Sequence, residues 1–529
     1  MTTLNSPLLT NKVDDSVHRL VSWLRWFAEN RLNSYLNDSR KCIPPYLILE
    51  FGNKGLFGLN TPSTYNGLGL TNTGICTILE QLGAIDLSLS TLIINNNFLG
   101  IRPIVHFGSD FLRNKYLPEL ASGRALISFA LSESAAGSNP LRIEGRGVIH
   151  ENYCILNASK MWIGSASWST LINTFVHVED PNGKQHGITC YAVPSDTAGV
   201  QIGEELMTMG MRTMVQNKIY YRDAKLFREF LVGDVGSGMQ VANDAMTYTR
   251  LAFAASFLGS MKRCMQLVHR YTSRRKISST ARLLENPITL QKLGAVMAMV
   301  DLVDASVMLT AAHLDSGHVL PREIYIVCKV AGSEFLWNTI DISIQALGGR
   351  GYLENNVLPQ IMRDARVTRI FEGPTETLLA FMGSKLIKEN ENSEILRFMD
   401  LLVGDKVIVK NLREIQQLAK AIVARNTARL GEVSFALGEI VMWSLLVAIL
   451  MSYSERFPSS SARWGIDKLS LKTSRFKDAR YTPVEVLSAG EFDTRVAQTC
   501  FAIGDLEQTA LGEDVSIDPY LRIALPDGH

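Results

Sequence analysis

The chain has 529 residues, of which 46% are hydrophobic, and its 53 Lys and Arg against 52 Asp and Glu give a formal net charge of +1. This near neutrality excludes the strongly basic surface that is typical of proteins that bind nucleic acid or an anionic membrane. The length is sufficient for several packed domains.

Neither a leader nor a membrane span is predicted. The first 20 residues lack the basic region and apolar core of a signal peptide. The longest apolar stretch, residues 440–451, is shorter than a bilayer span and predicts a buried helix instead. The seven scattered cysteines include no C-x-x-C pair, which favours a reducing compartment. We therefore expect a cytoplasmic protein without a transmembrane segment.

Residues 1–124 have the pattern of helices, and a β-rich part follows them. Leu20, Leu24 and Phe27 recur at the spacing of one helix face. From residue 125 to residue 235, short β-branched and aromatic runs alternate with turn residues. These runs predict strands over residues 126–133, 153–163, 171–180, 187–194 and 217–227.

Long helical patterns return in residues 236–388. They predict helices over residues 241–276, 289–317 and 324–349. A last block, residues 389–529, starts with a polar segment and continues with apolar residues at helical spacing, from Leu412 to Ile422. The expected fold is therefore mostly α, with a small central β domain and an extra helical domain at the C-terminal end.

The common nucleotide-binding and hydrolytic motifs are missing. "GGRGYLE" has Glu354 where the last glycine of G-x-G-x-x-G should stand, and no P-loop, H-E-x-x-H or G-x-S-x-G occurs. The histidines form no cluster, so no metal site is predicted. A nucleotide cofactor, if there is one, must be held by another device.

Three features before residue 300 have both a functional and an ordinary interpretation. The small-residue turn 135–138 follows a strand, so its N–H groups can face a diphosphate or a thioester, although most such turns bind only water. Trp162 lies on a predicted strand, where a lone Trp usually belongs to the core or its rim. Arg250 interrupts a long apolar helix and requires an acid or a phosphate, because arginine is seldom buried unpaired.

The fourth feature is Glu372, which precedes a Gly-Pro pair and an apolar helix. Pro374 suits a first helical position, and Leu378, Leu379, Phe381 and Met382 are expected to bury one side. An acid at this place stabilises the positive end of a helix dipole. The alternative is that Glu372 is a general base in a dry site.

The order and spacing of these four features along the chain resemble those of the acyl-CoA dehydrogenases, a family of flavoenzymes. Residues 130–139 are similar to the family's A-L-T-E-P-x-A-G-S-D, and residues 160–164 are similar to its K-x-W-I-T. Arg250 and Arg275 match its two helix arginines. Residues 345–352 and 363–366 match Q-x-x-G-G-x-G-Y and R-D-A-R. The similarity covers about residues 10–388, and the tail resembles the helical appendage of the very-long-chain members.

The resemblance implies four domains: an N-terminal helical domain, a β-barrel-like middle domain, a four-helix bundle and an extra helical domain. We place them at residues 1–124, 125–235, 236–388 and 389–529. It also implies that Glu372 removes the α-proton of an acyl thioester while the β-hydrogen leaves as hydride to flavin N5. The N–H of Glu372 would help to polarise the thioester carbonyl. In some relatives the base precedes the helix arginine, but here that residue is Thr249.

The roles of the other site residues are also carried over from the family. Substrate contacts are expected from Ser138, Thr247, Arg250 and Gly373. FAD contacts are expected from Phe129, Leu131, Ser132, Gly137, Ser138, Trp162, Gly164, Arg275, Gln345, Gly348, Gly349, Pro374 and Glu376. A neighbouring subunit would contribute Arg275, Gln345, Gly348 and Gly349, which implies a homodimer or a homotetramer.

Three departures from the family pattern leave alternatives open. Gly164 replaces a hydroxyl near flavin N5, for which Ser165 or a water would have to substitute, and Ile277 and Pro374 replace further FAD contacts. The first hypothesis is a dehydrogenase of acyl-CoA or of an acyl carrier protein, in lipid or polyketide metabolism, with an electron-transfer flavoprotein as acceptor. The second is an acyl thioester oxidase that uses O2. The third is a non-catalytic scaffold.

Overall fold

A computed structural model describes residues 14–390, 393–403, 406–453, 455–478 and 488–504. Most of the segment in which no leader is expected, residues 1–20, lies outside the described residues. The chain divides into two compact units, residues 1–474 and 475–529. The first unit contains every predicted site residue, and all contacts discussed below lie within it.

The N-terminal helices form where the apolar pattern predicts them. The Asp14 carboxylate accepts a hydrogen bond from the N–H of Ser16 and caps the first helix, which buries Leu20, Leu24 and Phe27. A π-helical segment, η3 (Asn95–Ile101), joins the fifth helix to the sixth. The helices are α1 (Asp15–Asn30), α2 (Ser34–Arg40), α3 (Pro45–Asn53), α4 (Asn72–Ile85), α5 (Leu87–Ile94), α6 (Arg102–Phe107) and α7 (Asp110–Ala121).

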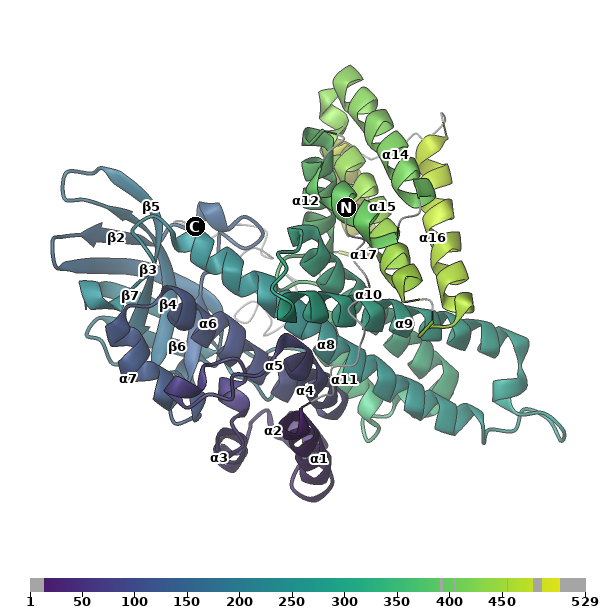
Figure 1. Ribbon diagram of the computed structural model, residues 1–529, viewed down its shortest axis with the longest axis horizontal. Coiled ribbons are helices and arrows are strands. Elements are labelled where there is room, and N and C mark those ends of the chain that lie inside the picture. The colour runs from purple at the N-terminus through teal and green to yellow at the C-terminus, as the bar shows by residue number, and fades with distance from the viewer. Residues whose placement is uncertain (1–13, 391–392, 404–405, 454, 479–487, 505–529) are drawn as a thin grey trace. The chain divides into compact units, whose positions relative to one another are not determined.

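The β domain is one sheet in the order β6-β7-β3-β2-β4-β5-β8, with β1 parallel to β4 (Figure 1). All five predicted strands form. β2, β6 and β8 were not predicted, because they are short or carry mostly polar and glycine residues. The strands are β1 (Ile127–Ala130), β2 (Arg146–Ile149), β3 (Tyr153–Gly164), β4 (Leu171–Glu179), β5 (Gln185–Pro194), β6 (Val200–Glu205), β7 (Gln216–Phe227) and β8 (Leu231–Val232).

The bundle helices agree with the prediction to within a few residues. They are α8 (Gly238–Thr272), α9 (Pro287–Asp315), α10 (Arg322–Leu347), α11 (Val357–Thr368) and α12 (Thr375–Lys388). Two details of α12 differ from expectation. Pro374 is the N-cap and not the first helical residue. Phe381 is 42% exposed, because its ring lies beside the Arg322 guanidinium and not in the core.

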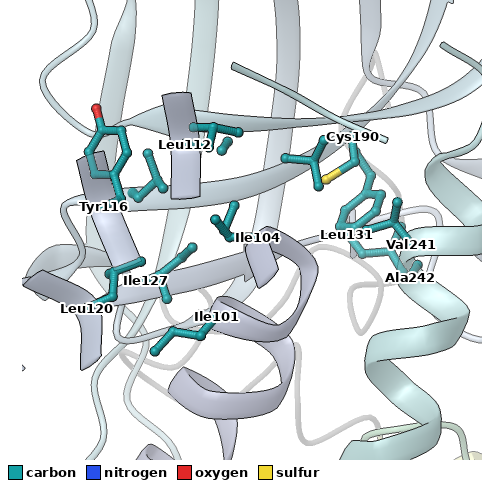
Figure 2. Packing of buried hydrophobic residues seen from close by; sticks show 14 of the residues in the cluster. Ile101, Ile104, Leu112, Tyr116, Leu120, Ile127, Leu131, Cys190, Val241 and Ala242 are labelled. Carbon is teal, nitrogen blue, oxygen red and sulfur yellow. The ribbon is translucent and has the colours of Figure 1, made fainter. Parts of the chain in front are cut away.

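One apolar cluster joins three of these parts. Figure 2 shows Ile104, Leu112, Ile127, Cys190 and Val241, which come from α6, α7, β1, β5 and α8, packed together. Burial of apolar surface drives this contact. The N-terminal helices, the sheet and the start of α8 are therefore fixed relative to one another, and they surround the site described below.

The extra C-terminal helices in the first unit pack on the bundle. They are α13 (Glu394–Val403), α14 (Lys406–Arg425), α15 (Leu430–Ser452) and the part of α16 (Ser459–Lys477) up to residue 474, whereas α17 (Ala489–Ile503) belongs to the second unit. Among the described helices, two are long and apolar enough to span a membrane, at residues 287–315 and 427–452. Their apolar windows are 78% and 83% buried, as in core helices of a folded protein.

Helix α12 crosses α15 at two glycines (Figure 1). A Cβ at Gly383 would lie 1.8 Å from the Ser434 carbonyl oxygen, and one at Gly438 would lie 1.9 Å from the Leu379 carbonyl oxygen. These distances leave no room for a methyl group, so the two backbones are in direct contact.

We expect Gly438→Ala to push α15 away from α12 and to destabilise the protein by about 1–3 kcal/mol, as overpacking does. Thermal unfolding by circular dichroism measures the effect. Gly431→Ala is the matched control, because it lies on the same helix and its Cβ would meet no atom within 4 Å. Equal melting temperatures for the two variants would contradict the close crossing.

Candidate functional site

A cavity of about 920 Å³ lies where the N-terminal helices, the sheet and the bundle meet. Of the predicted site residues, eleven line it: Phe129, Leu131, Ser132, Gly137, Ser138, Trp162, Gly164, Arg250, Glu372, Gly373 and Pro374. Glu372 is the only acid among the lining residues, which also include four arginines. No group of three or more His, Cys, Asp or Glu side chains in the described part of the chain is placed to hold a metal ion.

Glu372 lies in a sharp turn between α11 and α12, the 369–375 loop. Its φ is 56°, and that of Gly373 is 97°. The left-handed region is unfavourable for a residue with a side chain, so the surroundings must hold Glu372 there. The N–H groups of Glu372 and Gly373 have no hydrogen-bond partner among the described residues.

Side chains from two bundle helices hold the 369–375 loop. Arg250 on α8 donates from Nε and Nη2 to the Glu372 carbonyl oxygen, at 3.2 and 3.1 Å. Lys329 on α10 donates from Nζ to the Gly373 carbonyl oxygen at 2.7 Å. Glu334 accepts hydrogen bonds from Arg369 and Thr375 at the two ends of the loop. An acid or a phosphate was expected beside Arg250, but its hydrogen-bond partner is the backbone carbonyl oxygen of Glu372.

Burial sets the protonation equilibria of this site. Burial raises the pKa of Glu372 to about 7, against the opposing effect of the Arg250 and Lys329 charges. Burial also lowers the pKa of Lys329 to about 7 and that of Arg250 to about 10. Glu372 Oε2 is buried and has no hydrogen-bond partner in the described structure. This oxygen is therefore shielded from solvent, and it is free to accept a proton.

Apolar side chains surround part of Glu372. Phe371 packs on Phe253 of α8, with ring centroids 4.6 Å apart, and both rings line the cavity. Ile370 also lines the cavity, although it is half exposed. Thr249 donates its hydroxyl to the Ala245 carbonyl oxygen and stays out of the cavity.

A buried ion pair fixes the turn between β1 and β2. The Lys160 side chain is wholly buried and donates to Glu133 Oε1 at 2.6 Å and to the Leu131 and Phe175 carbonyl oxygens at 3.3 and 2.6 Å. Glu133 also accepts the N–H of Gly145 at 3.1 Å. This network positions the following turn, residues 135–138, whose Gly137 and Ser138 line the cavity.

The end of β3 presents Trp162 and an open wall at Gly164. Trp162 is 52% exposed and lines the cavity. A Cβ at Gly164 would lie 3.4 Å from Asn95 Nδ2 and 3.5 Å from Gln216 Nε2. Ser165 Oγ is buried without a partner in the described residues. The wall therefore carries the Ser165 hydroxyl, one of the two substitutes considered for the lost hydroxyl, and also two carboxamide groups that were not predicted.

Six predicted site residues do not line this cavity: Thr247, Arg275, Gln345, Gly348, Gly349 and Glu376. Thr247 donates its hydroxyl to the Asn243 carbonyl oxygen within α8. Arg275 follows the other end of α8, and the helix rise places that end about 33 Å from Arg250. Arg275 lines a separate open pocket of about 390 Å³, together with Arg270, Arg274 and Arg350. Arg275 therefore cannot reach the Glu372 site of its own chain.

Lys329 was not predicted from the sequence. It interrupts an apolar run, residues 324–330, as Arg250 interrupts α8. The rule that singled out Arg250 applies to Lys329 equally, because a cation inside an apolar helix requires a polar partner. The apolar run around Lys329 can be seen in the sequence, but its partner, the carbonyl oxygen of Gly373, cannot.

Comparison with known proteins gives three adjoining family matches. The acyl-CoA dehydrogenase N-terminal, middle and C-terminal domain models match residues 15–124, 128–224 and 236–387. The chain is 30% identical over 372 residues to very long-chain specific acyl-CoA dehydrogenase of Rattus norvegicus, which covers 69% of this chain. It spans 56% of that protein's length and 58% of the human counterpart's.

Solved structures share the fold. Butyryl-CoA dehydrogenase from Megasphaera elsdenii superposes with a TM-score of 0.66 at 23% identity, over 71% of this chain and 98% of that one. The prolyl acyl carrier protein oxidase AnaB superposes with a TM-score of 0.67 at 21% identity, over 70% and 99%. The helices after residue 390 lie beyond the three matched domains.

We expect Glu372 to titrate near pH 7, above the ordinary pKa of a glutamate, because its carboxylate is buried. Difference infrared spectroscopy of the carboxyl C=O band, wild type against Glu372→Gln, measures this titration. A midpoint below pH 5 would show that the carboxylate is well hydrated, which contradicts the dry site.

Proposed function

This chain belongs to the acyl-CoA dehydrogenase family of flavoprotein oxidoreductases, and we propose that it converts an acyl thioester to the trans-2-enoyl thioester. The observation that carries the proposal is Glu372, whose Oε2 is buried without a partner in the described structure and which lines a cavity without another acid. A buried base with a pKa near 7 is suited to removing a weakly acidic proton at neutral pH. Because the chain spans little more than half of its curated mammalian relatives, the activity of the whole protein is part of this proposal.

The cavity residues fit FAD. Orphaned polar atoms, Ser165 Oγ and Arg250 Nη1, lie in its wall, and the Gly137 turn leaves open space around its Cα. Phe129, Leu131, Ser132, Trp162 and Gly164 would hold the cofactor from the sheet, with the carboxamides of Asn95 and Gln216 nearby. When bound, FAD accepts the β-hydrogen of the acyl group as hydride.

Glu372 would take the α-proton. Its Oε2 has no partner to displace, and the positive φ of Glu372 and Gly373 keeps the carboxylate and both N–H groups at one turn. The unpaired N–H groups can donate to the thioester carbonyl oxygen, and this stabilises the negative charge that develops there. Carbonyl activation and proton removal would thus come from the same few residues.

The charge of the wall suits an anionic ligand. Four arginines and one acid line the cavity, and the buried Arg250 Nη1 and Arg322 Nε have no partner among the described residues. Both FAD and a phosphopantetheine thioester, on coenzyme A or on a carrier protein, carry phosphate. The named relatives include an acyl-CoA dehydrogenase and an acyl carrier protein oxidase, so both carriers should be tested.

We expect Glu372→Gln to retain bound FAD. Its rate of flavin reduction by acyl thioesters should fall by about a thousandfold or more, because no other acid lines the cavity. Anaerobic bleaching of the flavin absorbance, with acyl-CoAs and acyl carrier proteins as substrates, measures it. Glu394→Gln, an exposed acid on α13, is the control and should bleach normally. Full bleaching of Glu372→Gln would refute the base, and a wild-type protein that stays colourless with FAD would favour a scaffold. Rapid recolouring in air would indicate an oxidase.

We expect the protein to be at least a homodimer. Arg275, Gln345, Gly348 and Gly349 lie away from the Glu372 cavity of their own chain, so they can contact FAD only in a neighbouring subunit. Sedimentation velocity of the FAD-loaded protein measures the mass, and a dimer or tetramer is expected. A monomer with a full complement of FAD would contradict these four assignments.

A further inference from the structure

We propose that Lys329 is a positioning residue, which holds the 369–375 loop together with Arg250 and keeps the Glu372 carboxylate ionised. The inference rests on the proposed role of Glu372 as base, and it adds a residue for which neither the sequence patterns nor the comparisons assign a function.

Lys329 is an unusual group to find at its position. It lies in the middle of α10 with 0% exposure, between Cys328 and Val330, which are also buried. The only hydrogen bond of the Lys329 side chain among the described residues is the 2.7 Å contact of its Nζ with the Gly373 carbonyl oxygen. A buried ammonium without a carboxylate in contact is costly, so a methionine would suit this place better for stability alone.

The geometry indicates what the ammonium does. Arg250 and Lys329 bind the carbonyl oxygens of successive residues, Glu372 and Gly373, both of which have positive φ. Rotation of either peptide unit would break one of these contacts. The two helices α8 and α10 therefore fix the loop by its backbone and leave the carboxylate free for a substrate proton.

The charges around Glu372 point to the second role. Arg250 and Lys329 both favour its ionised form, and the Glu372 charge in turn favours protonated Lys329. Other charged groups surround the loop, and Glu334 and Glu376 also favour protonated Lys329. On α11, Arg363 is paired with Asp38, and Arg366 lies over the Trp337 ring. Arg369 on the loop is paired with Glu334 on α10, Arg322 on α10 affects mainly Arg250, and Glu376 on α12 is exposed.

The sign of the effect follows from these charges. Burial alone would raise the pKa of Glu372 further, and the two cations oppose this increase. Removal of the Lys329 charge would therefore move the Glu372 midpoint to higher pH. The ionised fraction of the base at neutral pH would fall, and the reaction would recover as the pH is raised.

The test compares Lys329→Met with Lys329→Arg in the FAD-loaded full chain. We expect the methionine variant to shift the Glu372 infrared midpoint upward by about one pH unit, as loss of a neighbouring opposite charge does. A shift of one pH unit changes the protonation equilibrium tenfold, so the ionised fraction of Glu372 at pH 7 should fall about fivefold. The rate of flavin reduction should fall by the same factor near pH 7 and recover near pH 9. The arginine variant should stay close to wild type, and so should Lys388→Met, an exposed lysine on α12.

An unchanged infrared midpoint in Lys329→Met would overturn the proposal, and so would an equal shift in Lys388→Met. If the methionine variant does not fold, Lys329→Gln removes the charge but keeps a donor, and the same upward shift is expected. The infrared titration is read without substrate. A wild type that never reduces its flavin therefore refutes the proposed function, whereas the midpoints still decide the role of Lys329.

Discussion

The burial of one carboxylate between two cations is the constraint on which the site depends. Glu372, Arg250 and Lys329 all lose most of their hydration, and each such loss is unfavourable unless partners replace the water. The partners are the loop carbonyls and the mutual attraction of the charges. Their arrangement requires α8, α10 and the 369–375 loop to be in place at the same time. The bundle thus serves as the frame of the Glu372 loop as well as a hydrophobic core.

The opposite wall of the cavity repeats this arrangement with different residues. Here Lys160 and Glu133 form a buried ion pair, which uses backbone carbonyls and N–H groups as its remaining partners. It fixes the turn that carries Gly137 and Ser138, as the first set fixes the turn that carries Glu372. The apolar cluster of Figure 2 then joins the N-terminal helices, the sheet and α8, so that the two fixed turns face one cavity.

Much of this could be predicted from the sequence, and the exceptions have physical reasons. Long periodic helices such as α8 and α10 were predicted well, since many residues repeat the same signal. The short strands β2 and β6 offer only a few residues, and hydrogen bonds to neighbouring strands decide them. Glu372 and Arg250 were singled out by their local sequence pattern, and the family resemblance supplied the roles proposed for them. Lys329 was missed because its partner is a carbonyl far along the chain, and the family pattern gives no distance from Arg275 to the Glu372 cavity.

The crossing of α12 and α15 has a consequence for shortened versions of the chain. Gly383 and Gly438 let the two backbones touch, so α15 covers a face of α12 that includes Leu379 and Met382. A protein cut after α12 would expose this apolar face to water, directly behind the turn that holds Glu372. The appended helices therefore cannot be trimmed away to give a minimal enzyme, and any truncation intended for crystallisation should keep residues up to the end of α15.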